Sequence, residues 1–244
     1  MGQVIVITSG KGGTGKTTAC AAVSSCLVAL GHKTLAIDCD VGLRNLDISL
    51  GMSDFAVSDI ADVAEGRIEL LDAVHEHPEL PGLFFLSAPL YKPQSAISPV
   101  STARLFELAR ENFEFILVDS PAGLGSGFEF ASQHADSAIV VATADPASIR
   151  NAGRTVETLE ELGHTDIRLL MNKVDKLGWA RYNTTIDDIV DATGAQLIGV
   201  VWDDSAVPSA ASSESLLVLH SRGRAAHGFL DTARRLCGED IPMR

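Results

Sequence analysis

A glycine-rich loop stands between a β-branched run and a helix-forming segment, and this order restricts the fold more than any other feature. The run is Val-Ile-Val-Ile at 4–7, the loop occupies 10–18, and a segment rich in Ala, Val and Leu extends over 19–30. The spacing fits the phosphate-binding pattern G-x-x-x-x-G-K-[ST], and the flanking strand and helix are the context that this pattern requires. The sequence therefore predicts a P-loop NTPase.

The chemistry of the loop assigns the nucleotide contacts. Glycines leave room for successive backbone N–H groups to converge on a phosphate, and the helix that begins near Lys16 directs its positive dipole end to the same point. Lys16 is placed to neutralise the β- and γ-phosphates, and the hydroxyl of Thr17 to ligate Mg²⁺. The residues assigned to the bound nucleotide in this loop are Gly12, Gly13, Thr14, Gly15, Lys16, Thr17 and Thr18.

Short apolar strands alternate with helical stretches along all 244 residues. This alternation predicts an α/β fold with a doubly wound, mostly parallel sheet in a single domain, 1–244, and a ligand site at the carboxyl ends of the strands. Strands are expected at 3–8, 34–38, 83–87, 115–119, 137–143, 168–172 and 196–201. Helices are expected at 16–30, 58–65, 102–112, 148–162, 186–192 and 225–237.

Composition narrows the compartment and the partners. No apolar run is long enough to span a membrane, and the first residues lack the features of a signal peptide. The 4 cysteines have neither metal-ligand spacing nor a disulfide framework, so they are expected to be reduced thiols in a cytoplasmic protein. The net charge of -13, without a dense Lys/Arg patch, indicates that strong nucleic-acid binding is not expected.

Acidic residues follow two of the predicted strands. Asp38 and Asp40 end and follow the strand at 34–38, and Asp119 ends the apolar strand at 115–119. An aspartate at a strand end is often a turn or capping residue. With the P-loop present, Asp119 instead has the Walker B position, where a carboxylate holds Mg²⁺ through a water. Gly123, four residues on, is placed to offer its N–H to a γ-phosphate.

The loop and the acidic segments together resemble the MinD/ParA family of deviant Walker A ATPases. The resemblance is carried by a second lysine, Lys11, in the string Lys-Gly-Gly-Thr-Gly-Lys-Thr-Thr, by Gly-Leu-Arg-Asn-Leu-Asp at 42–47, and by Asp-Ser-Pro-Ala-Gly at 119–123. It implies an ATP-dependent homodimer in which Lys11 reaches the partner's phosphates, as an arginine finger does elsewhere. It also implies that Asp40 orients the attacking water and that Asp38 supports the Mg²⁺ shell.

These assignments give a complete predicted site for ATP and Mg²⁺. The predicted catalytic residues are Lys11, Lys16 and Asp40. The predicted metal residues are Thr17, Asp38 and Asp119.

The base pocket is predicted from the later strands. Asn172, at the end of the strand at 168–172, has an amide that can pair with the adenine edge. The string Asn-Lys-Val-Asp at 172–175 is also the guanine-reading string of GTPases, but the loop and switch segments favour ATP. Trp202 stands where the family usually has a proline, and it either stacks on the purine or fills the edge of the core. Asp204 is a further candidate nucleotide contact.

The resemblance, which covers 1–239, implies a function in spatial regulation, through septum-site or cell-division positioning. The dimer would present a surface to a protein partner, and hydrolysis of ATP to ADP and phosphate would reset it. Two alternatives remain: a DNA-partitioning ATPase of the ParA type, or a regulator of flagellar or secretion assembly that uses nucleotide as a switch.

The C-terminal segment departs from the family pattern. MinD-type members usually continue into an amphipathic membrane-targeting helix, whereas the helix at 225–237 has the spacing of one that docks on the core, through Phe229 and Ala233 among others. We expect no autonomous membrane anchor, and recruitment to a membrane only through a partner.

Two other segments are predicted to have lesser roles. The string His-Glu-His at 75–77 is flanked by prolines and is interpreted as a solvated loop without a metal. The segment 148–151 resembles a partner-facing surface of the family, but Asn151 and Gly153 stand where the family commonly has aspartate.

Overall fold

The computed structural model describes residues 1–41, 44–55, 58–89, 97–175 and 185–243. Within these ranges one sheet has the strand order β3-β4-β2-β5-β1-β6-β7-β8, and only the β3–β4 pair is antiparallel. The strands are β1 (Gln3–Thr8), β2 (Thr34–Asp38), β3 (His75–Glu76), β4 (Leu83–Leu86), β5 (Phe115–Asp119), β6 (Ser137–Ala142), β7 (Ile167–Val174) and β8 (Gln196–Trp202).

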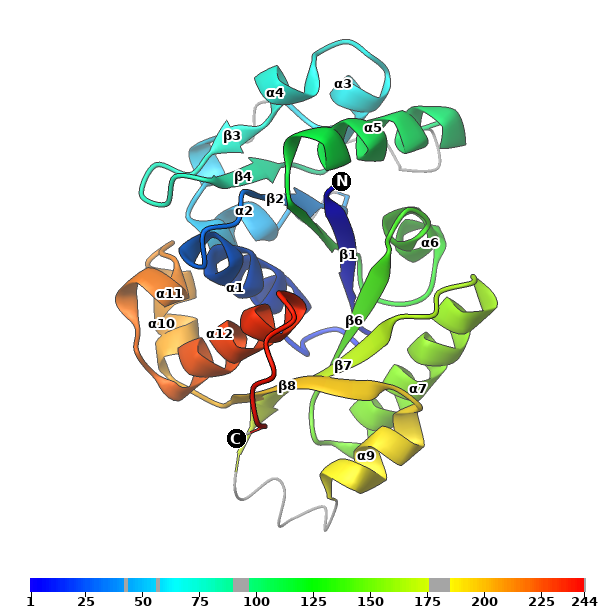
Figure 1. Ribbon diagram of the computed structural model, residues 1–244, viewed down its shortest axis with the longest axis vertical. Coiled ribbons are helices and arrows are strands. Elements are labelled where there is room, and N and C mark those ends of the chain that lie inside the picture. Colours follow the sequence, from blue (N-terminus) through cyan, green and yellow to red (C-terminus); the bar gives the residue numbers. More distant parts are fainter. Residues whose placement is uncertain (42–43, 56–57, 90–96, 176–184, 244) are drawn as a thin grey trace.

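Helices cover both faces of this sheet, so the predicted doubly wound α/β fold is confirmed (Figure 1). The long helices are α1 (Lys16–Ala29), α5 (Pro99–Asn112), α7 (Pro146–Glu161) and α12 (Arg224–Leu236). The shorter ones are α2 (Leu46–Leu50), the 3₁₀ turn η1 (Ser53–Phe55), α3 (Ile60–Ala64), α4 (Leu70–Ala73), α6 (Ser126–Ser132), α9 (Ile186–Thr193), α10 (Ala206–Ser212) and α11 (Leu217–His220).

The sheet divides the core into two layers, and the central strand β1 contributes side chains to both. Val4 and Val6 point into the cluster that contains residues of α5, α6 and α7, whereas Ile5 and Ile7 point into the cluster under α1 and α12. All four side chains are fully buried. This is the alternation expected of a strand covered on both faces, and it explains the continuous apolar run in the sequence.

Each predicted strand is present with boundaries within two residues of the expected ones. Helices α5 and α7 begin earlier than expected, at Pro99 and Pro146, because the side chains of Ser98 and Asp145 accept a backbone N–H of the first turn. Proline at the first helical position needs no N–H partner, so a capped proline starts these helices. The described elements that were not predicted are β3, α2, η1, α4, α6, α10 and α11, all short.

His77 corrects one prediction. The segment at 75–77 is not a solvated loop: His75 and Glu76 form β3 against β4, and His77 is only 6% exposed. Its Nε2 lies 2.9 Å from the carbonyl oxygen of Leu50 in α2, and its Nδ1 accepts the backbone N–H groups of Glu79 and Leu80 at 3.1 Å. The histidine is therefore a neutral core residue that joins two segments.

The C-terminal helix behaves as its spacing predicts. Phe229 and Ala233 of α12 are buried in the cluster shared with α1, and Leu230, Leu236 and Cys237 pack partly against it. No helix within the described ranges has the length and apolar character that a bilayer crossing requires.

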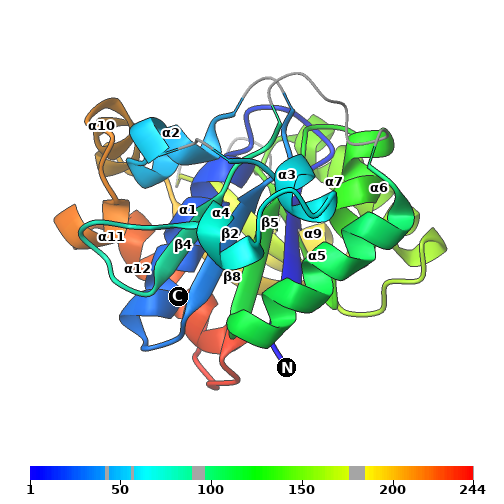
Figure 2. The same cartoon turned by 90° about the horizontal axis from the view of Figure 1, so that it is seen from above.

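The parallel strands bring their carboxyl ends to one edge of the molecule, at the top of Figure 2, while the N-terminus lies at the opposite edge. Loops from β1, β2, β5, β6 and β7 therefore converge at the upper edge. This is where an open α/β sheet places its ligand site.

Candidate functional site

The glycine-rich loop connects β1 to α1 in the predicted manner. Gly13 and Gly15 have φ values of 81° and 89°, which non-glycine residues rarely adopt, and Gly15 is the N-cap of α1. A side chain at Gly10 would clash with the backbone of Asn151 in α7, so the loop lies directly against that helix. Gly12 is exposed, with no neighbouring atom near the place of a side chain.

Lys16 and Asp119 form the centre of the site. Their Nζ and Oδ1 atoms lie 3.1 Å apart, and the side chains are only 8% and 1% exposed. Asp38 and Asp119 are register partners at the ends of the neighbouring strands β2 and β5, and both are buried. The structure thus brings together one cation and two carboxylates that sequence analysis had assigned to the same site.

Burial disfavours the charge on these acids. Burial, with the neighbouring Asp119 carboxylate as the second cause, raises the pKa of Asp38 to about 7. Burial also raises the pKa of Asp119 despite the opposing effects of Lys16 and the hydrogen bond from Thr17. The pKa of Asp40 is likewise raised by burial and lowered, to a smaller extent, by Lys16. One lysine therefore does not neutralise the acids, and the site has a deficit of positive charge.

This donor set fits a magnesium ion held together with phosphates. Within the described ranges no three His, Cys, Asp or Glu side chains converge to hold a metal by themselves. Mg²⁺ in nucleotide sites does not need them, because it takes one or two protein oxygens and completes its shell with phosphates and water. The hydroxyl of Thr17 and the carboxylate of Asp119 are such oxygens, and Thr17 is near enough to lower the pKa of Asp119.

Asp38 holds the described ends of the first switch segment by hydrogen bonds to its backbone. Its two carboxylate oxygens accept the backbone N–H groups of Asp40, at 2.7 Å, and of Leu46, at 3.2 Å. These bonds bridge the segment that follows β2 and place Asp40, half-buried, beside Lys16. Gly42 and Leu43 of the predicted switch string lie outside the described residues.

Lys11 lies on the outer side of the loop, away from the buried charges. Its Nζ is 3.3 Å from Oδ1 of Asp145, and its side chain is 46% exposed. Asp145 is the N-cap of α7, and it also accepts hydrogen bonds from Ser148 N and Thr143 Oγ1. The hydrogen bonds from Thr143, Ser148 and Lys11 together lower the pKa of Asp145, against the opposing effect of burial.

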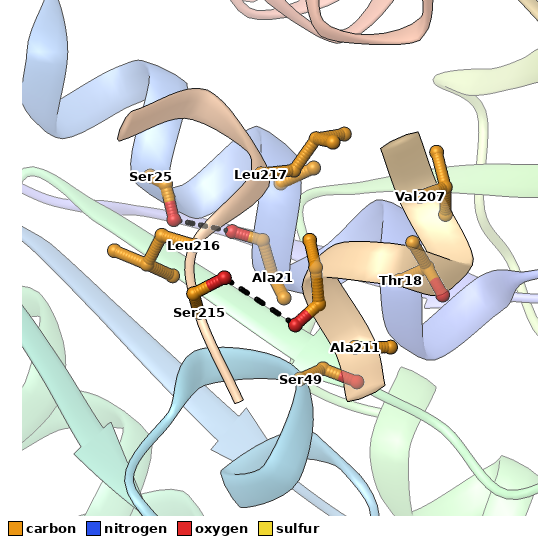
Figure 3. A pocket seen from close by; sticks show the side chains of 11 residues that line it. Thr18, Ala21, Ser25, Ser49, Val207, Ala211, Ser215, Leu216 and Leu217 are labelled. Atoms are coloured by element: carbon orange, nitrogen blue, oxygen red, sulfur yellow. Dashed lines mark hydrogen bonds between the residues drawn. The ribbon is translucent and has the colours of Figure 1, made fainter. Parts of the chain in front are cut away.

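Thr18 lies in the first turn of α1. It lines a small cavity of about 30 Å³ between α1, α2, α10 and α11, together with alanines and serines (Figure 3). Ser25 and Ser215 donate to the carbonyl oxygens of Ala21 and Ala210, so their hydroxyls are satisfied within the chain. The cavity has room for about two water molecules. The nucleotide contact of Thr18 stays a prediction.

Asn172 is close to the loop, as predicted, but its amide contacts the protein. Its Nδ2 donates to the carbonyl oxygen of Thr14 at 2.8 Å, and its Oδ1 accepts the backbone N–H of Lys173 at 2.9 Å. The residue is 4% exposed. Reading of the adenine edge stays a prediction.

Trp202 and Asp204 also make contacts within the chain. The guanidinium of Arg224 lies 4.2 Å from the centre of the indole ring, and the ring packs against the core at the end of β8. The carboxylate of Asp204 accepts the backbone N–H groups of Ala206 and Ala225, at 2.9 and 3.3 Å. These hydrogen bonds lower its pKa. Asp204 thus joins the starts of α10 and α12, and its contact with nucleotide stays a prediction.

The second switch begins where β5 ends. The Ser120 hydroxyl donates to Thr8 Oγ1 at 2.9 Å, which ties this segment to the end of β1. Gly123 has a φ of 88° and no neighbouring atom near the place of a side chain. Thr14 Oγ1 is buried without a hydrogen-bond partner among the described residues.

Sequence reasoning missed three contributors to the site: Asp145, Thr8 and Lys173. Asp145 precedes a proline at a helix start, and this capping signal could have identified it. Lys173 was seen only as part of a nucleotide-reading string, whereas its Nζ donates to the carbonyl oxygen of Gly13 at 2.8 Å. Nothing in the sequence indicates the pairing of Thr8 with Ser120.

Gly153 has a packing role. A side chain there would lie 2.9 Å from the carbonyl oxygen of Ala192 in α9, so glycine permits the close contact of α7 with α9.

Known proteins are similar to this chain in sequence and fold. The CobQ/CobB/MinD/ParA nucleotide binding domain matches residues 5–218. The septum site-determining protein MinD of Bacillus subtilis is 33% identical over 247 residues, which cover 100% of this chain and 92% of that protein. A chain of the MinC:MinD cell division protein complex of Aquifex aeolicus superposes with a TM-score of 0.91 at 36% identity, covering 99% of this chain and 98% of that one. MinD of Pyrococcus horikoshii, solved with Mg-ADP, gives a TM-score of 0.85 at 26% identity, with 97% and 96% covered.

Proposed function

The chain belongs to the CobQ/CobB/MinD/ParA nucleotide-binding family, as one of its MinD-type members, and from this premise we propose that it is a Mg-ATP-dependent ATPase that acts as a dimer. One observation carries the proposal: two lysines of the same loop have opposite environments. Lys16 is buried against Asp119, whereas Lys11 is 46% exposed on the outer side. The first serves the phosphates of its own chain, and the second is accessible to another copy.

The reaction is hydrolysis of ATP, in which water attacks the γ-phosphorus and the bond to the β-γ bridging oxygen breaks. Lys16 and the backbone N–H groups of the loop bind the phosphates. Asp40, beside Lys16, orients the water and receives its proton through the phosphate or directly. Thr17 and Asp119 would hold Mg²⁺, which offsets the charge of the phosphates when it is bound.

Lys11 supplies the remaining positive charge in trans. In the single chain it is paired with Asp145, on an exposed surface where an ion pair is weak. Dimer formation would replace this partner with the phosphates of the other chain, in a desolvated interface where the charge has a larger effect. Turnover would then require two chains.

The output is spatial regulation in cell division. The relatives are septum site-determining proteins, and the Aquifex structure is a MinC:MinD cell division complex. We expect the ATP-bound dimer to bind a protein partner and to release it after hydrolysis. The net charge of -13 disfavours the DNA-partitioning alternative.

Lys11→Ala tests the mechanism. We expect turnover to fall by about 10²–10³, since a transition-state contact is lost, while affinity for Mg-ADP stays within about threefold. Turnover per chain of the wild type should rise with protein concentration, and light scattering should show a dimer with Mg-ATP that persists in Asp40→Ala.

The control is Lys33→Ala, which removes a lysine at the opposite edge of the sheet, where it lies over Phe84 and Phe113. Its turnover should equal that of the wild type. A Lys11→Ala protein as active as the wild type would refute the proposal, and so would turnover per chain independent of concentration.

A further inference from the structure

Two consecutive residues near the end of β7, the buried Asn172 and the exposed Lys173, hold the P-loop through its carbonyl oxygens. Lys173 Nζ donates to the carbonyl oxygen of Gly13, and Asn172 Nδ2 donates to that of Thr14, both at 2.8 Å. A side chain at Gly15 would clash with the Asn172 amide and would lie 3.6 Å from Cε of Lys173. Glycine at this position therefore lets both side chains reach the loop.

These bonds determine where the loop's donors point. In a trans peptide the C=O and the N–H of one plane point in opposite directions. Since the carbonyls of Gly13 and Thr14 point outward to Lys173 and Asn172, the N–H groups of Thr14 and Gly15 point to the opposite, concave side. That side is the one that cradles phosphate oxygens in a P-loop.

The backbone at Lys173 is strained. Its φ is 54°, in the left-handed region, which the described part of the chain shows for just two other non-glycine residues, Arg44 and Glu214. Glycine would adopt this conformation without penalty. A lysine in this conformation, with its ammonium on a P-loop carbonyl, is the kind of outlier that accompanies function.

We propose that Lys173 is a positioning residue for the nucleotide phosphates, which presets the P-loop before nucleotide binds. Its charged donor holds the Gly13–Thr14 peptide and polarises it, so that the N–H at the other end becomes a better donor to phosphate. Asn172 does the same, without charge, for the Thr14–Gly15 peptide. The inference rests on the proposed nucleotide-binding function and assigns to this lysine a role on the outer side of the loop.

The test compares Lys173→Gly with the wild type, because glycine removes the ammonium and also relieves the backbone strain. We expect calorimetric titration with Mg-ADP to show about tenfold weaker binding, the effect of losing one charge-assisted hydrogen bond. The thermal midpoint without nucleotide should be equal or higher. KM for ATP should rise by a similar factor, while turnover at saturating ATP stays within about twofold.

Two further variants separate the ammonium from other effects. Lys173→Arg retains a charged donor and should bind Mg-ADP within about threefold of the wild type. Lys33→Met removes a positive charge at the far edge of the sheet and should leave Mg-ADP binding unchanged, which excludes a general charge effect.

The outcomes distinguish the two proposals. Lys173→Gly with wild-type affinity for Mg-ADP refutes the positioning role and leaves the ATPase proposal intact. Weak binding of Mg-ADP by both Lys173→Arg and Lys173→Gly also refutes the positioning role, because a charged donor at this position would then not be enough to restore binding. A wild type that binds neither Mg-ADP nor Mg-ATP refutes the ATPase proposal itself.

Discussion

The P-loop and the first switch segment face each other across the candidate site, but they are stabilised in opposite ways. The P-loop is held by neutral and cationic donors, Asn172 and Lys173, on its carbonyl oxygens. The switch segment is held by a buried carboxylate, Asp38, that accepts the N–H groups of Asp40 and Leu46. The P-loop is thus formed without a ligand, whereas the switch segment lies beside concentrated negative charge.

This difference separates two functions within one site. On the proposed function, the N–H groups of the P-loop would bind the phosphates common to ADP and ATP, so the P-loop would supply affinity without distinguishing them. The crowded carboxylates Asp38 and Asp119 are relieved by added positive charge, so the acidic side should respond to the metal. Affinity and metal response should therefore be separable by mutation.

Asp119→Asn should have the largest effect of the variants, because it should abolish the effect of Mg²⁺ on nucleotide binding. The variant loses the carboxylate at the Mg²⁺ position, and we expect ATP turnover to fall by about 10²–10³. Titration with ADP should show that Mg²⁺ strengthens binding to the wild type but not to the variant. Without Mg²⁺ the two proteins should bind ADP within about threefold of each other.

A matched control is Asp136→Asn, at the opposite end of the strands, where the carboxylate pairs with Arg110. This variant should keep both turnover and the Mg²⁺ effect. An Asp119→Asn protein that loses ADP binding even without Mg²⁺ would show that the two sides of the site are not separable.

The predicted site residues that the structure brings together share one property: each ends a strand or begins a helix that the local pattern identifies. The meeting of Lys16, Asp38 and Asp119 follows from parallel strands whose carboxyl ends share an edge. The contacts that were missed join segments far apart in the chain. Lys11 and Asp145 are separated by 134 positions, Lys173 and Gly13 by 160, and Ser120 and Thr8 by 112.

His77 shows a second limit of sequence reasoning. Flanking prolines predict a loop, but a histidine that satisfies three backbone groups is stable in the core. Likewise, the carboxylate of Asp204 caps two helices, which a pattern based on strand ends does not reveal. Polar residues held in place by tertiary hydrogen bonds have no periodic signature.

The contacts of His77 can be tested by pH. This histidine joins α2, which follows the switch segment, to the segment between β3 and β4. Burial lowers the pKa of His77 below its ordinary value of 6.5. The folded state therefore binds this proton more weakly than the unfolded state, and stability is lost as pH falls below 6.5. The thermal midpoint should fall by about 2–4 °C more in the wild type than in His77→Gln between pH 7.5 and 5.5.

The control for this pH test is His227→Gln, at an exposed position of α12, which should retain the wild-type pH dependence. Identical pH profiles for the wild type and His77→Gln would contradict the proposed role of the buried imidazole.

Glu214→Gly should have the smallest effect on stability, and it provides a direct comparison with Lys173→Gly. Both residues have a left-handed backbone, with φ values of 47° and 54°, and each donates or accepts one side-chain hydrogen bond. The partner of Glu214 is the exposed hydroxyl of Ser53 near α2, not a P-loop carbonyl, so relief of strain should exceed the lost bond by about 0.5 kcal/mol. The thermal midpoint should rise by about 1–2 °C, and Mg-ADP affinity should stay unchanged. Loss of Mg-ADP affinity in both glycine variants would mean that the left-handed residues act through the backbone. Loss in Lys173→Gly alone assigns the effect to the ammonium.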